Sequence, residues 1–246
     1  SKTSKFGLDS EAVNKISDEA RENKLVNITS IACHIGSQIS DENLILKSLD
    51  VISEIANNLS ANGHAIKFLD IGGGLGIQYK DEEEGNPKIL MAGVKNRLEG
   101  KEYKIILEPG RSIIGSAGIL VTRIEYIKNA GGKKFAIIDA GMNDLIRPSL
   151  YDAWHEVKEL ENREISSDTY DLAGPVCETG DILAKDRNLK ILPNDFVAFM
   201  DVGAYGSVMS SNYNSRLKPM ELLVRGGEIE VIRRKETFED LIALES

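Results

Sequence analysis

The sequence predicts an α/β fold in the first half of the chain and an antiparallel β fold in the second half. In the first half, strand-type apolar runs alternate with helical patterns, and each run ends in a polar or glycine-rich segment. This alternation is typical of parallel βα units. From Gly118 onward, strand-type runs follow one another and are joined by turn-rich segments. We therefore expect two domains, residues 1–117 and residues 118–246.

The elements of the first half follow from their start signals and apolar spacing. Asp9 can cap a helix that extends to about Glu22, a longer helical pattern covers residues 41–59, and another ends near Leu98. The strand-type runs are residues 26–35, 66–71 and 103–107. Three such units cannot close an eight-stranded barrel, so a barrel would need further strands.

The second half contains strand-type runs with few helical patterns. The pair Gly131-Gly132 separates the first two runs and predicts a hairpin turn. A short helix is expected from about Glu236 to Leu244. The predicted strands cover residues 119–127, 133–139, 195–202 and 222–231.

The composition is that of a globular protein, with 41% hydrophobic and 28% charged residues. A net charge of -9 argues against nucleic acid as the main partner, because phosphate contacts need clustered Lys and Arg. No apolar run approaches the roughly 20 residues that span a bilayer. Cys33 and Cys177 follow no zinc-site spacing, so we expect no metal site, free thiols and a reducing, cytoplasmic compartment.

Candidate functional residues follow each predicted strand of the first half. Gly72, Gly73 and Gly74 come directly after a buried-type strand, a pattern that suits either a phosphate site or a tight turn. Glu108 and Arg111 flank a Pro-Gly pair after the next strand and can bind a ligand or form a structural ion pair.

The remaining strand of the first half ends at His34, with Ser37 three residues later. A lone histidine there is more often a packed side chain than a catalyst. Ligands of parallel α/β folds bind where the carboxyl ends of the strands converge. Because polar or glycine-rich segments follow all three predicted strands, their co-occurrence favours one ligand site.

The second half adds further candidates. Arg147 and Tyr151 are four residues apart, and if Pro148 starts a helical turn they can face one pocket; the alternative is a surface turn. Cys177 lies beside Glu178 in a glycine-bounded loop, although a single thiol is usually buried and inert. Tyr205 follows a strand in a Gly-Ala-Tyr-Gly turn.

Taken together, these segments resemble the fold-III pyridoxal-phosphate-dependent decarboxylases, and within them the diaminopimelate decarboxylases. The resemblance covers the whole chain and follows the family's motif order. It implies the C-terminal part of an alanine-racemase-like (β/α)8 barrel, an antiparallel β domain, and a homodimer with shared active sites. The motifs are SKFGLD, HIGSQ, DIGGGLGI, EPGRS, GMNDLIRPSLYDAWHE, GPVCETGDIL and DVGAYGSVMSSNYNSR.

The resemblance also implies a role for each matching residue. Pyridoxal 5'-phosphate would be the cofactor, with Glu108 at its ring nitrogen and His34 against its ring. Cys177 would be the catalytic proton donor. The other cofactor-binding residues would be Ser37, Gly72, Gly73, Gly74, Gly110, Arg111 and Tyr205. The substrate-binding residues would be Arg111, Arg147, Tyr151, Glu178 and Tyr205.

The implied activity is decarboxylation of meso-2,6-diaminopimelate to L-lysine in lysine biosynthesis. One departure is that the family's cofactor-linking lysine lies in an early Val-Lys-Ala-Asn-like motif, and no lysine here has that context. Lys5 belongs to a later motif. We therefore expect this chain to be part of a longer enzyme and inactive alone. The alternatives are a non-catalytic homologue that binds a partner or the cofactor, and a decarboxylase for another basic amino acid.

Overall fold

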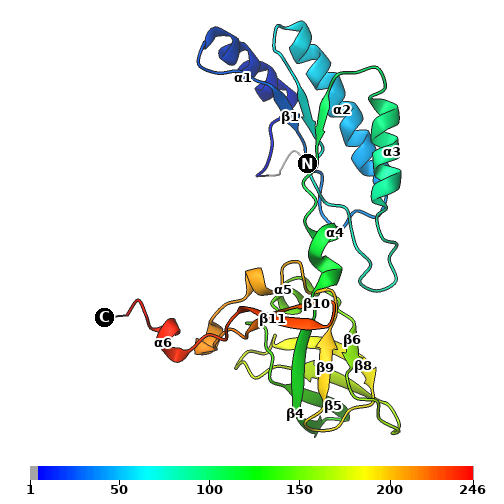
Figure 1. Ribbon diagram of the computed structural model, residues 1–246, viewed down its shortest axis with the longest axis vertical. Helices are drawn as coiled ribbons and strands as arrows, with labels where there is room; N and C mark the ends of the chain where they lie inside the picture. The colour runs from blue at the N-terminus through cyan, green and yellow to red at the C-terminus, as the bar shows by residue number, and fades with distance from the viewer. Residues whose placement is uncertain (1–4, 246) are drawn as a thin grey trace. The chain divides into compact units, whose positions relative to one another are not determined.

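The structure, a computed structural model, describes residues 5–245 and divides into two compact units, Ser1–Ile113 and Ile114–Ser246 (Figure 1). The first residue of the SKFGLD motif lies outside the described range. The domain boundary predicted between residues 117 and 118 falls at the end of a 3-10 turn, η1 (Gly115–Ala117). In the part of the chain that is described, no helix has the length and apolar character to cross a membrane.

Unit 1 is built on a three-stranded parallel sheet in the order β1-β2-β3. The strands are β1 (Ser30–Ala32), β2 (Phe68–Asp70) and β3 (Lys104–Ile106). The helices are α1 (Ser10–Glu22), α2 (Glu42–Ala61), α3 (Pro87–Arg97) and the short α4 (Arg111–Ile114). Helix α2 packs on β1, β2 and α3. The predicted parallel βα units are confirmed, with strands shorter than the apolar runs.

Local capping fixes where these helices begin. The Asp9 carboxylate accepts a hydrogen bond from the Ala12 amide at 2.8 Å, and Asp41 does the same for Asn43 at 3.0 Å. Such caps satisfy amides that have no partner within the helix. The apolar face of α2 then enters the core, where Leu49 and Ala56 are fully buried with Leu69 of β2. The helices predicted from Asp9 and Asp41 are confirmed.

Unit 2 contains a six-stranded mixed sheet in the order β6-β9-β4-β5-β7-β8. Its strands are β4 (Leu120–Ala130), β5 (Lys133–Ile138), β6 (Val157–Glu159), β7 (Asp168–Ala173), β8 (Ile182–Leu189) and β9 (Phe196–Phe199). The edge strands β6 and β8 contact each other, so the sheet nearly closes around its apolar core. The prediction of an antiparallel domain is wrong in one respect, because β5 and β7 pair in parallel.

Strands β6, β7 and β8 were not predicted from the sequence, because β6 has only three residues and polar residues interrupt the apolar pattern of β7 and β8. Asp171 of β7 is buried, and its charge is offset by an ion pair to Lys133 at 2.7 Å. The predicted strand 222–231 is instead a hairpin of β10 (Glu221–Arg225) and β11 (Glu228–Arg233). Gly226 and Gly227 form its turn with φ of 57° and 90°, which favours glycine. The predicted C-terminal helix is the shorter α6 (Phe238–Leu241), capped by Thr237.

Candidate active site

In unit 1 the segments after β1, β2 and β3 meet. The Glu108 amide donates to the Gly72 carbonyl at 2.8 Å, which joins the end of β3 to the glycine segment. The Gly73 amide donates to His34 Nδ1 at 3.3 Å, and the Ile39 amide donates to the Gly74 carbonyl at 2.8 Å. The predicted convergence of the three strand ends is therefore present in the structure.

The close approach of these segments requires glycine. A Cβ on Gly73 would lie 2.2 Å from the Glu108 carbonyl oxygen, and a Cβ on Gly74 would lie 2.1 Å from the Gly36 carbonyl oxygen. Gly74 also has φ of 97°, a backbone conformation that other residues rarely adopt. The glycine run is thus what allows polar groups from three strands to share one small region.

The three glycine amides differ in what they offer a phosphate. The Gly72 amide already donates to Asp70 Oδ1 at 2.9 Å. The Gly73 amide makes only the long bond to His34, and within residues 5–245 the Gly74 amide donates to no protein acceptor. Backbone amides that donate weakly or not at all to the protein fit a phosphate group, chiefly at Gly73 and Gly74.

Arg111 lies at the same region and contacts a residue predicted with it. Its Nη2 donates to Ser37 Oγ at 3.1 Å, and its Nη1 donates to the Tyr79 hydroxyl at 2.6 Å. The guanidinium also lies 5.5 Å from the centre of the Tyr79 ring. Tyr79 was not predicted as a site residue, and its only signal in the sequence is its place three residues after the DIGGGLG segment. Gly110 is exposed, and a Cβ there would meet no atom within 4 Å.

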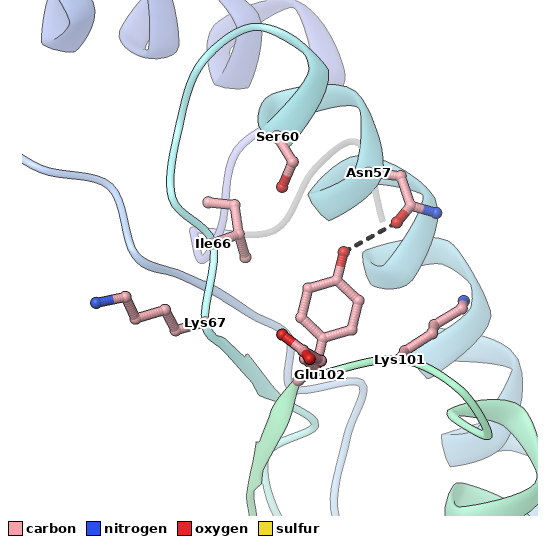
Figure 2. A pocket seen from close by; sticks show the side chains of 7 residues that line it. Asn57, Ser60, Ile66, Lys67, Lys101 and Glu102 are labelled. Carbon is pink, nitrogen blue, oxygen red and sulfur yellow. Dashed lines mark hydrogen bonds between the residues drawn. The ribbon is translucent and has the colours of Figure 1, made fainter.

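A separate cavity of about 360 Å³ lies at the other end of the strands of unit 1 (Figure 2). Its lining comes from residues that precede β2 and β3, together with the C-terminal part of α2. The Tyr103 hydroxyl donates to Asn57 Oδ1 there at 2.9 Å. None of the predicted site residues lines this cavity. The lining residues are Asn57, Ser60, Ile66, Lys67, Lys101, Glu102 and Tyr103.

In unit 2 the predicted helical turn is present as α5 (Arg147–Tyr151), with Pro148 in its first turn. Arg147 is buried, whereas Tyr151 has 62% of its surface exposed. The two side chains therefore lie in different environments within this unit. The reason is that Arg147 packs inward onto a histidine.

That histidine, His155, was not predicted and is fully buried. Its Nε2 lies 3.0 Å from Arg147 Nη1, and its Nδ1 lies 2.8 Å from the Met200 carbonyl oxygen. A guanidinium only donates and a carbonyl only accepts, so these contacts require a neutral ring with the proton on Nδ1. His155 thus orients Arg147 as a hydrogen-bond acceptor.

A second buried cation supports this histidine. Arg187 Nη2 donates to the His155 carbonyl at 3.1 Å, and its guanidinium stacks on the Trp154 ring. Burial lowers the pKa of Arg187 to about 10, partly offset by Asp186 and Asp171. The RPSLYDAWH motif contains Arg147 and His155, which drew attention to this segment. Arg187 of β8, however, lies 32 residues after His155, so the motif alone does not indicate that contact.

Cys177 and Glu178 lie side by side in an exposed loop between β7 and β8. Both cysteines are free thiols, as predicted. Burial raises the pKa of Cys33, which is half-buried, whereas Cys177 is exposed and thus not the inert buried thiol of the alternative interpretation. The Tyr213 hydroxyl donates to Glu178 Oε2 at 3.4 Å.

Two further features lie in the loops of unit 2. Tyr205 has φ of 62°, a strained backbone conformation for a residue with a side chain, of the kind found at functional sites. A cavity of about 490 Å³ is lined by Met142, Asn143, Ile146, Ser211 and Tyr213. Tyr213 thus contacts Glu178 and lines this cavity; its only sequence signal was the polar SSNYN segment.

Comparison with known proteins identifies relatives along the whole chain. The chain is 43% identical to a diaminopimelate decarboxylase of Pseudomonas aeruginosa over 100% of its own length, and 44% identical to that of Aquifex aeolicus over 97%. It spans 59% and 57% of those relatives. A crystal structure of the Helicobacter pylori diaminopimelate decarboxylase complexed with L-lysine matches 99% of this chain and 61% of that one, with TM-score 0.94 and 40% identity.

A family model described as "Pyridoxal-dependent decarboxylase, C-terminal sheet domain" matches residues 12–203. The match covers most of both units, including the segments that meet around Gly73 and the loop that carries Cys177. The chain therefore belongs to the pyridoxal-dependent decarboxylase family.

Proposed function

We propose that this chain is part of a pyridoxal-phosphate-dependent enzyme that decarboxylates meso-2,6-diaminopimelate to L-lysine. The chain would supply the last part of a (β/α)8 barrel and the sheet domain that follows it. The observation that carries the proposal is the meeting of His34, Gly73 and Glu108 at three parallel strand ends. Relatives at 40–44% identity that bear the name of this enzyme support it.

The residues of unit 1 suit the cofactor. Gly73 and Gly74, with Ser37, Gly110 and Arg111, would bind the phosphate, and Gly72 would shape the cradle through its bond to Asp70. His34 would pack on the ring, and Glu108 would keep the ring nitrogen protonated. When bound, the cofactor supplies an electron sink for the charge left by the departing carboxylate.

The residues of unit 2 suit the rest of the reaction. Arg147 and Glu178 carry opposite charges, which recognition of a distal ammonium and carboxylate pair requires. Tyr151 would contact the same end of the substrate, and Tyr205 would cover the cofactor and the substrate. Cys177 would donate the proton that replaces carbon dioxide. Because Arg147 is oriented by His155, its geometry is set before substrate binds.

We further propose a cytoplasmic homodimer in which Cys177 and Glu178 serve the site of the neighbouring subunit. The main alternative is a non-catalytic homologue, which would need neither an exposed thiol beside Glu178 nor an oriented Arg147. The gene upstream of Ser1 distinguishes the two. An in-frame barrel segment with the cofactor-linking lysine supports the enzyme, whereas a start codon directly before Ser1 contradicts it.

In the full protein, meaning this chain together with its lysine segment, Arg147→Ala should lower kcat/KM for diaminopimelate at least about tenfold. The reason is that a charge-assisted contact contributes about 1.5–3 kcal/mol. Tyr151→Phe should weaken substrate binding in the same direction. Steady-state kinetics and cofactor titration measure both effects. Equal losses of cofactor and substrate affinity would contradict a substrate-binding role for these residues.

A further inference from the structure

The loop that carries Cys177 and Glu178 ends in a buried carboxylate, Asp181, which the proposed function does not use. Only 2% of its surface is exposed. Its Oδ2 accepts from the Val176 amide at 2.7 Å, and its Oδ1 accepts from the Met142 amide at 2.6 Å. Burial raises its pKa, and the two amide bonds and the charge of Arg216 oppose that rise.

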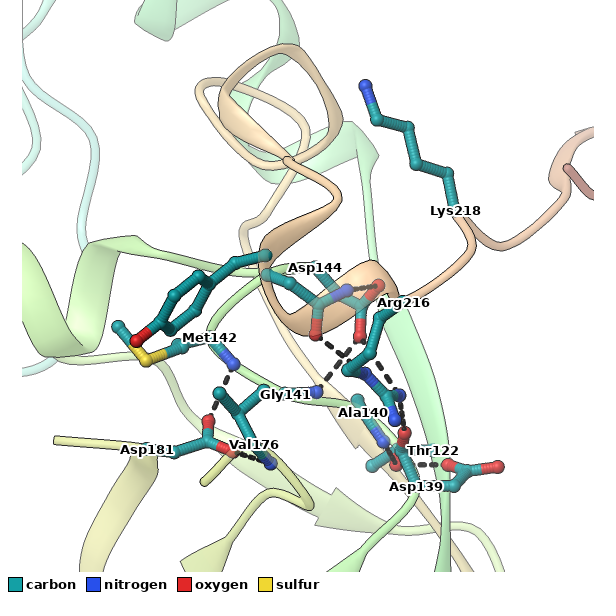
Figure 3. Close-up of polar contacts among 12 residues, drawn as sticks. Thr122, Asp139, Ala140, Gly141, Met142, Asp144, Val176, Asp181, Arg216 and Lys218 are labelled. Carbon is teal, nitrogen blue, oxygen red and sulfur yellow. Dashed lines mark hydrogen bonds and ion pairs between the residues drawn. The ribbon is translucent and has the colours of Figure 1, made fainter. Parts of the chain in front are cut away.

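These two amides belong to different segments (Figure 3). Val176 directly precedes Cys177, so one bond fixes the loop at its reactive end. Met142 lies in the turn Gly141–Asp144, which leads into α5 and therefore to Arg147. One carboxylate thus links the loop of the proposed acid to the helix of the proposed substrate-binding arginine.

Two glycines leave the space that the Asp181 carboxylate occupies. A Cβ on Gly174 would lie 2.3 Å from Asp181 Oδ2, and a Cβ on Gly141 would lie 3.3 Å from the same oxygen. The Gly174 amide also donates to the Asp181 carbonyl at 2.9 Å. The room left by Gly174 is therefore occupied by the carboxylate, and a side chain there would displace it.

The turn that Asp181 holds is also fixed from its other side. Arg216 Nε donates to Asn143 Oδ1 at 2.8 Å, and its Nη2 donates to the Asp139 carbonyl at 2.6 Å (Figure 3). Arg216 follows Tyr213, whose hydroxyl contacts Glu178. The Met142 turn is thus the common support of α5, the Tyr213 segment and the Cys177 loop.

We infer that Asp181 is a positioning residue that holds the Cys177–Glu178 loop on the turn before α5, so that the acid and the substrate-binding residues keep one geometry. The inference rests on the proposed function for its catalytic consequence. Its structural part, the link between two loops, concerns residues of unit 2 alone.

The test is Asp181→Asn in the full protein. An Asn keeps one acceptor oxygen, but its amide group opposes the second N–H donor, so one of the two links is lost. We expect kcat to fall about ten- to a hundredfold, because a misplacement of about 1 Å has effects of that size. The solvent deuterium isotope effect on kcat should rise as proton delivery becomes limiting, whereas a loss of folded protein leaves it unchanged.

The matched control is Asp171→Asn, the same change at another buried carboxylate of unit 2 that lies outside this loop. A second pair of variants, Gly174→Ala and Gly180→Ala, tests the inference if Asp181→Asn does not fold. Gly174→Ala displaces the carboxylate without removing it, and Gly180→Ala, with open space around its Cβ, is its control in the same loop. Gly174→Ala should reproduce the raised isotope effect and Gly180→Ala should not.

Amide hydrogen exchange makes the inference independent of activity. Met142 and Val176 should exchange faster in Asp181→Asn than in Asp171→Asn. If the full protein decarboxylates no substrate, the proposed function fails while this exchange still tests the link. Unchanged exchange at both amides, or equal kcat losses in Asp181→Asn and Asp171→Asn with an unchanged isotope effect, would overturn the inference.

Discussion

Replacing Cys177 by alanine in the full protein should lower kcat for diaminopimelate by about 10²–10⁴-fold, the contribution typical of a positioned general acid. The exposed thiol beside Glu178 is the donor that our account assigns to the final proton. Cofactor affinity should stay the same, because the proposed cofactor residues of unit 1 are unaltered. Rapid-quench or steady-state assays measure the loss. A variant that keeps more than about a tenth of the activity would remove Cys177 from the proton-transfer step.

Subunit mixing tests whether this acid serves the neighbouring site. Cys177→Ala subunits are mixed with subunits that lack the cofactor-linking lysine, each inactive as a homodimer. If sites are shared, one of the two sites in each mixed dimer has both groups. Random mixing should then restore about a quarter of full activity, since half of the dimers are mixed and half of their sites are intact. Activity no higher than that of the separate variants, with mixed dimers present, would contradict a shared site.

Replacing Gly73 by alanine should disrupt unit 1 and its cofactor site together. The new Cβ would lie 2.2 Å from the Glu108 carbonyl oxygen, so one of the two backbone segments must move. Such overpacking costs about 1–3 kcal/mol of folding free energy. If the cofactor binds only to the original geometry, the same free energy must be supplied on binding, and the cofactor affinity falls by about ten- to a hundredfold.

Denaturant unfolding and cofactor titration measure these two effects. Gly110→Ala is the control for stability, because a Cβ at Gly110 meets nothing within 4 Å and its φ is not positive. A Gly73→Ala protein as stable as the Gly110→Ala protein, with unchanged cofactor affinity, would contradict the close packing of the strand ends.

Local signals in the sequence were enough to predict much of unit 1. Asp9 and Asp41 cap helices within three residues of themselves, so a short window contains the whole interaction. The same holds for the Gly131-Gly132 turn between β4 and β5. In contrast, β7 and β8 depend on buried charged groups such as Asp171, whose partner Lys133 belongs to another strand.

The candidate site likewise combines parts that local sequence signals predict with parts that depend on contacts between distant residues. The polar and glycine-rich strand ends were visible in the sequence, and parallel pairing brings them together. The contacts that hold the Cys177 loop and Arg147 in unit 2 could not be predicted from the sequence, because they join residues far apart in the chain. Asp181 bonds to Met142 across 39 positions, and His155 bonds to Met200 across 45. Apolar periodicity carries no information on such contacts, and only the packed sheet brings them together.

The most direct test of the central claim is product analysis with the full protein. Purified protein loaded with pyridoxal phosphate is incubated with meso-2,6-diaminopimelate, and separately with lysine, ornithine and arginine. We expect carbon dioxide and L-lysine in equal amounts from diaminopimelate, at a kcat/KM well above that for the other three. A folded, cofactor-loaded protein that releases no carbon dioxide from diaminopimelate, or prefers ornithine or arginine, would contradict the account.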